Sequence, residues 1–125
     1  RTSNFKRSGR DHFEPQDSMD PAASRRLRGL LEQIDYTAFA SNREVLAAIL
    51  GRADAQKFQR LAVAAAQARA TWVKAALMMT ETGAVIEPRQ TAKLAELRSN
   101  YEELAEAYEA LRRMVERGYI GFAPN

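Results

Sequence analysis

The side chains best suited to chemistry stand near the beginning of the chain. Its only histidine, His12, lies in the run Asp11-His12-Phe13-Glu14, and Asp17 follows three residues later. Imidazole nitrogens and carboxylate oxygens are ligands for divalent cations. Metal sites need ligands held in place, however, and this stretch has neither a helical nor a strand period. We therefore expect a solvated polar segment here and no bound metal.

A second carboxylate cluster lies near the end of the chain and consists of Glu102, Glu103, Glu106 and Glu109. Helices that bind paired metal ions combine such carboxylates with a Glu-x-x-His motif, which this chain lacks. The glycines are isolated, so the sequence contains no phosphate-binding loop. Without cysteine there is also no thiolate nucleophile or thiolate metal site. The sequence thus predicts no catalytic residue, no metal and no cofactor, and hence a protein that is not an enzyme.

The composition favours helix. The 125 residues include only 6 glycines and 4 prolines, and alanine, leucine, glutamate and arginine are abundant. The lack of cysteine fits the cytoplasm, another reducing compartment or the inside of an assembled particle. No apolar stretch approaches the ~20 residues that cross a bilayer, and no signal peptide is visible. We expect no membrane partner.

Residues 1–20 are expected to form an extended, flexible arm, because their composition is too polar to bury a core. Their charges run from a basic block to an acidic one. Two phenylalanines, Phe5 and Phe13, are the main apolar anchors and are expected to bind a partner. The basic side chains would meet the phosphates of a nucleic acid without sequence preference; they are Arg1, Lys6, Arg7 and Arg10.

The remaining residues up to 118 are expected to form a single helical domain that begins with two shorter helices, over residues 21–35 and 42–50. Asp20 is a suitable N-cap for the first of them, and Pro21 a suitable first residue. Ser41 and Glu44 match a capping box that would start the second helix. Gly51 would end it.

Two long helices are expected next, over residues 55–82 and 89–117. In both of them, apolar residues recur at a spacing of 3, 4, 3, 4, 3, 4. The first seam consists of Phe58, Leu61, Ala65, Ala68, Trp72, Ala75 and Met79, and the second of Leu94, Leu97, Tyr101, Leu104, Tyr108, Leu111 and Val115. The short loop between them predicts a long antiparallel, coiled-coil-like hairpin and an all-α fold. We interpret the aromatic residues of the seams as packing rather than as a ligand site.

Two further apolar features remain to be covered. A stripe on the first long helix, formed by Ala62, Ala66, Val73 and Leu77, requires either the N-terminal helices or another subunit. Residues 119–125 form an apolar tail after Gly118. We expect Tyr119, Ile120 and Phe122 to reach outward into a neighbouring subunit, because aromatic anchors beside flexible residues are typical binding hot spots. The alternative is that the tail folds back on its own long helix.

These features favour a non-catalytic helical assembly or interaction subunit of a homo- or hetero-oligomeric complex, a build found in small components of viral and phage particles. The alternative is an oligomeric DNA-binding protein that uses the arm and residues 44–62, which partly match a helix-turn-helix. Lys57 and Arg60, however, fall where that motif requires apolar residues. A head of this kind followed by a long hairpin resembles, in architecture alone, the small terminase subunits that assemble into rings on phage DNA. No motif identifies a family.

Overall fold

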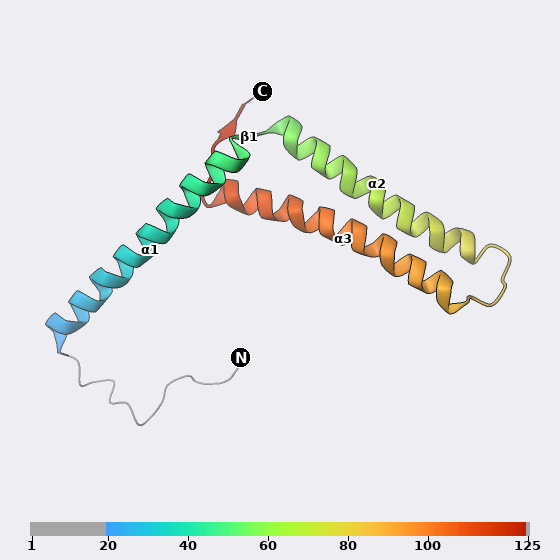
Figure 1. The fold of residues 1–125 in the computed structure, drawn as a ribbon, viewed down its shortest axis with the longest axis horizontal. Helices are drawn as coiled ribbons and strands as arrows, with labels where there is room; N and C mark the ends of the chain where they lie inside the picture. Colours follow the sequence, from blue (N-terminus) through green and yellow to red (C-terminus); the bar gives the residue numbers. More distant parts are fainter. Residues whose placement is uncertain (1–19, 125) are drawn as a thin grey trace. The chain divides into compact units, whose positions relative to one another are not determined.

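The computed structural model describes residues 20–124, which are mostly helical (Figure 1). The elements follow in the order α1 (Pro21–Leu50), β1 (Ala53–Asp54), α2 (Ala55–Met79), α3 (Pro88–Glu116) and β2 (Phe122–Ala123). The helical class is as expected, whereas the small strand pair was not predicted. The predicted site residues of the arm lie outside the described residues, namely Arg1, Phe5, Lys6, Arg7, Arg10 and Phe13.

The chain divides into two compact units, Arg1–Ala40 and Ser41–Asn125, and the division falls within α1. This single helix of 30 residues corrects the expectation of two helices over 21–35 and 42–50. The interval between those two ranges contains no glycine or proline, so nothing interrupts its backbone hydrogen bonds. The capping pattern at Ser41 is therefore not used. The start of α1 is as expected, because the Ala23 amide donates to Asp20 Oδ1 at 2.7 Å.

The end of α1 is joined tightly to the start of α2. Gly51 has a φ of 69°, a conformation that favours glycine at a helix terminus, and its amide donates to the Ala47 carbonyl at 2.9 Å. Asp54 caps α2 by accepting the Lys57 amide at 2.8 Å. The Lys57 ammonium in turn donates to the carbonyls of Arg52 at 2.6 Å and Leu50 at 3.3 Å. A cation thus satisfies two carbonyls at the end of a helix, where the helix dipole also favours positive charge.

α2 and α3 lie side by side as a helical hairpin, joined by residues 80–87 (Figure 1). α2 ends at Met79, three residues earlier than expected, and the Thr80 hydroxyl lies within hydrogen-bond distance of the Ala76 and Leu77 carbonyls of the last turn. α3 begins with Pro88 behind a capping box, in which the Glu87 amide donates to the Gln90 side chain at 2.8 Å. Gly118, with a φ of 76°, follows the end of α3 as expected.

The two predicted seams are the shielded faces of this hairpin. All seven seam residues of α2 and all seven of α3 are half-buried. Trp72 stacks on Tyr101 with ring centroids 6.0 Å apart, and Phe58 meets Tyr108 edge-on at 5.5 Å. No residue of either helix is fully buried, because a pair of helices covers only one face of each member.

The most deeply buried residues lie where the C-terminal tail meets the start of α2. Among residues 20–124, only Ala53 and Ile120 are nearly inaccessible, at 1 % and 4 % exposure. β1 and β2 pair in parallel, with Ala53 opposite Phe122 and Asp54 opposite Ala123. The Ala53 amide donates to the Gly121 carbonyl at 2.9 Å. We call this arrangement of residues 53–54 with 120–123 the clasp.

The clasp corrects the expectation that the tail reaches outward through Ile120, because that side chain is buried in its own chain. Phe122 is 46 % exposed, and its ring lies 6.1 Å from that of Phe58. Tyr119 is half-buried, and its amide donates to the Met114 carbonyl at 2.9 Å. The tail therefore folds back on the start of α2 and not on the alanine-rich stripe, because strand pairing satisfies its backbone there.

We predict that Ile120→Ala lowers the free energy of unfolding by about 2–4 kcal/mol, because it leaves a cavity at the most buried large side chain. Val85→Ala is the matched control at an 89 % exposed position and should change stability by less than about 0.5 kcal/mol. Urea denaturation followed by circular dichroism measures both. Equal stability of the two variants would show that the tail is not part of the core.

The hairpin seam should not tolerate charge. Leu104→Asp places a carboxylate against α2 and should lower the free energy of unfolding by about 2 kcal/mol or more. Glu103→Asp puts the same side chain one residue away, at an exposed position, and controls for helix propensity. If Leu104→Asp has the same melting temperature as Glu103→Asp, Leu104 is not part of the seam.

Candidate interaction surfaces

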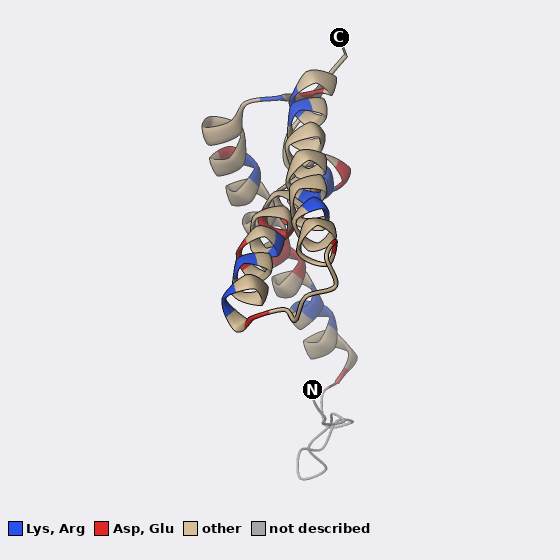
Figure 2. Cartoon of the chain, turned by 90° about the vertical axis from the view of Figure 1, so that its right-hand side faces the viewer, with Lys and Arg blue, Asp and Glu red and all other residues tan. Residues whose placement is uncertain are grey.

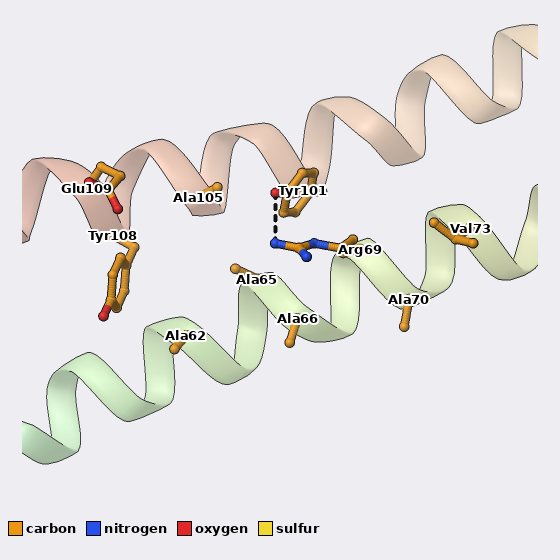
Figure 3. Close-up of a pocket in the computed structure, with 10 residues that line it drawn as sticks. All are labelled: Ala62, Ala65, Ala66, Arg69, Ala70, Val73, Tyr101, Ala105, Tyr108 and Glu109. Atoms are coloured by element: carbon orange, nitrogen blue, oxygen red, sulfur yellow. Dashed lines mark hydrogen bonds between the residues drawn. The ribbon is translucent and has the colours of Figure 1, made fainter.

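An open groove runs along the hairpin between α2 and α3 (Figure 3). Its floor consists mainly of small apolar side chains, and two tyrosines and two charged residues complete it. The lining residues are Ala62, Ala65, Ala66, Arg69, Ala70, Val73, Tyr101, Ala105, Tyr108 and Glu109. Small side chains on one helix allow another helix to approach closely. The groove therefore has the surface properties of a site for a helical or extended protein segment.

Two arginines and two aromatic rings form a layered cluster beside this groove. The Arg69 guanidinium donates to the Tyr101 hydroxyl at 3.0 Å and lies 4.9 Å from the centre of its ring. Tyr101 stacks on Trp72, with the ring planes 18° apart. Arg98 lies 5.9 Å from the Trp72 ring and also bonds Glu102 at 3.1 Å. Cation–π contacts and stacking thus join α2 to α3 and fix the position of Arg69 at the groove.

The ion pairs among the described residues of the hairpin do not cross between its two helices. Complementary charges on the two helices would favour pairs that cross the hairpin, but the ion pairs among residues 20–124 all lie on α3 or at its N-terminal cap. They are Arg89–Glu87, Lys93–Glu96 and Arg98–Glu102. On α2, Lys57 binds backbone carbonyls and Arg69 binds a phenol oxygen instead. Figure 2 shows basic and acidic residues interspersed along the helices.

The apolar stripe of α2 is not covered within the unit Ser41–Asn125. Its four residues, Ala62, Ala66, Val73 and Leu77, are all exposed, and the first three also line the groove. From the sequence we expected the N-terminal helices or another subunit to cover it. Exposed apolar surface of this kind, bordered by polar side chains, is typical of protein–protein contact sites.

α1 presents a second uncovered apolar face within the unit Arg1–Ala40. Leu27, Leu30, Leu31 and Ile34 are spaced so that they share one side of the helix, and each is 43–61 % exposed. No residue of α1 is buried. This face is visible in the sequence as an apolar stripe, but whether it faces a core cannot be read from the pattern alone.

The carboxylates of α3 do not form a metal-binding cluster. Glu102, Glu103, Glu106 and Glu109 are all exposed, and no group of three or more potential ligand side chains comes together within residues 20–124. Among the same residues, no helix is both long enough and apolar enough to cross a membrane.

The polar side chains of the groove were not predicted from the sequence. The place of Arg69 and Glu109 beside the alanine floor depends on how α2 and α3 are rotated against each other, which the sequence does not show. Of the residues predicted to bind partners, Phe122 remains exposed while Tyr119 is half-buried and Ile120 buried. Comparison with protein-family models, with curated proteins and with solved structures finds no match to this chain.

The aromatic cluster gives a direct test of the groove wall. Tyr101→Ala should lower the free energy of unfolding by about 1–3 kcal/mol through loss of the stacked ring. Tyr101→Phe removes only a partly exposed hydrogen bond and should cost less than about 0.5 kcal/mol. Trp72 is the only tryptophan, so its fluorescence reports the stack during urea denaturation. A Tyr101→Phe variant as unstable as Tyr101→Ala would mean that the hydroxyl, and not the ring, joins the helices.

Proposed function

We propose that this chain is a non-catalytic helical subunit of a multi-subunit assembly and that its coiled-coil-like hairpin binds another protein segment through the alanine-lined groove. The observation that supports this most directly is the exposure of the α2 stripe and groove floor. Burial of apolar surface contributes about 25 cal/mol per Å², so a face of this composition favours association over contact with water.

The distribution of buried and exposed residues points the same way. Only two of the described residues are nearly inaccessible, whereas fourteen large apolar side chains are exposed. A globular chain of this length usually buries a larger core of its own. A subunit that completes its core by association accounts for the difference, as obligate interfaces resemble a domain core divided between partners.

The polar residues of the groove suit recognition better than catalysis. Glu109 is the only carboxylate in the lining, and no histidine or cysteine accompanies it. Arg69 is held by Tyr101. A fixed guanidinium on one part of the wall and a carboxylate on another supply polar contacts that would orient a bound segment.

The alternative of a DNA-binding protein is less well supported by the described residues. Residues 29–125 contain twelve basic and twelve acidic side chains, and these are interspersed along the helices (Figure 2). Lys57 is one of the few basic residues of the segment that resembles a helix-turn-helix. Its ammonium already donates to two backbone carbonyls. A nucleic-acid interface requires a continuous basic surface.

The test is the particle mass of the full chain, measured by light scattering over a range of protein concentrations, with and without duplex DNA. Ala66→Glu introduces a charge into the groove and should lower the mass while leaving the thermal melt of the subunit unchanged, because Ala66 is exposed. Gln67→Glu introduces the same charge at an exposed neighbour outside the groove and should leave the mass unchanged.

Two outcomes would contradict the proposed function. A chain that remains monomeric at every concentration does not assemble as we propose. A mass that rises only with DNA, accompanied by salt-dependent retention on heparin, would favour the DNA-binding alternative.

A further inference from the structure

The exposed face of α1 is nearly symmetric under reversal of the chain direction. Leu27, Leu30, Leu31 and Ile34 are centred on the point between Leu30 and Leu31. Reversal about that point exchanges Leu30 with Leu31 and Leu27 with Ile34. Each large aliphatic side chain therefore meets another of similar size. Such self-complementarity is what a two-fold interface between identical chains requires.

The charges beside this face select one orientation. Arg28 and Asp35 are seven residues apart, so both lie along the same edge of the apolar face. When two copies of α1 pair in antiparallel orientation, these equivalent edges meet, and Arg28 of each copy lies beside Asp35 of the other. Two opposite-charge pairs form by symmetry. Neither residue has an ion pair with another described residue of its own chain.

A parallel pairing lacks this complementarity. It brings the edge that holds Arg28 and Asp35 against the opposite edge of the second copy, where Arg26 and Gln33 lie. Arg28 then faces a like charge, and Asp35 faces a neutral side chain. Ion pairs at the edges of paired helices contribute little affinity but discriminate between orientations. Antiparallel pairing also opposes the two helix dipoles favourably.

We propose that the face formed by Leu27, Leu30, Leu31 and Ile34 binds the same face of a second copy of this chain, in antiparallel orientation, with Arg28 of each copy paired to Asp35 of the other. This inference rests on the proposed role in assembly and specifies one contact within it. It concerns residues of α1 only and does not depend on the groove of the hairpin.

The absence of cysteine from the chain allows a clean cross-linking test. Leu27→Cys and Ile34→Cys are prepared as separate full-length variants, mixed, allowed to exchange subunits and oxidised mildly. In the antiparallel pair, positions 27 and 34 of different copies are opposite each other. Two copies of position 27 are about 10 Å apart along the axis, beyond the ~7 Å between Cα atoms that a disulfide bridges.

The mixture should therefore give a disulfide-linked dimer, whereas each variant alone should give little. Tyr36→Cys, at a position 70 % exposed on another side of α1, measures cross-linking by random collision. Efficient cross-linking of each variant alone would indicate parallel pairing and would overturn the inference. So would cross-linking of the mixture no faster than that of the Tyr36→Cys control.

Charge reversal provides a second readout on the same contact. Asp35→Arg turns each of the two opposite-charge pairs of the dimer into a pair of arginines. The repulsion should weaken self-association roughly tenfold. The double variant Arg28→Asp/Asp35→Arg restores opposite charges and should recover the dimer, as measured by sedimentation velocity. Failure of the double variant to recover it would overturn the assigned pairing.

The two proposals fail in distinguishable ways. If assemblies form and lose mass in Ala66→Glu, but keep their mass in Asp35→Arg and show no mixed cross-link, the α1 contact is wrong and the proposed function stands. If the chain is monomeric throughout, both are wrong. If a partner other than a second copy covers α1, the mixed variants do not cross-link, which also overturns the α1 contact.

Discussion

The packing of α2 against α3 along a single seam is the interaction on which the rest of the structure depends. Leucine and tyrosine of α3 meet a seam of α2 that is rich in alanine, and every seam residue is half-buried as a result. The pairing shields one face of each helix, and the apolar stripe on another face of α2 remains exposed. The groove, the exposed stripe and the small size of the core all follow from this arrangement.

The clasp and Lys57 stabilise the open end of this hairpin. The parallel pairing of β1 and β2 satisfies backbone groups just outside the ends of two helices, and Ile120 closes the small apolar core beside it. Lys57 donates to the carbonyls of Leu50, the last residue of α1, and of Arg52 just beyond it. Three kinds of interaction therefore meet in the short stretch around the start of α2: strand pairing, aromatic contact through Phe58, and a charged helix cap. Each is modest alone, and together they fix where the tail lies.

Much of the hairpin could be predicted because heptad spacing and caps are local signals. Asp54 and Gly118 mark helix ends through backbone chemistry that the sequence shows directly. The unbroken α1 was not predicted because a capping-box sequence allows a helix to start but does not require it. Ser41 is also tolerated within a helix when no glycine or proline interrupts the backbone. The two-residue strands have too little pattern to be recognised. The wall of the groove was missed because the contact of Arg69 with Tyr101 depends on the rotation of one helix against another.

The clasp also has a consequence for the order in which the chain folds. Ala53 and Phe122, which are paired in the clasp, are separated in sequence by the whole of α2 and α3. Closing so long a loop is entropically costly unless the intervening residues are already compact. We therefore expect α2 and α3 to pair first, from the loop at residues 80–87, and to bring the two strands close together. During synthesis, β1 has no strand to pair with until residues 122–123 have left the ribosome. We therefore expect the strand pair to form last in this unit.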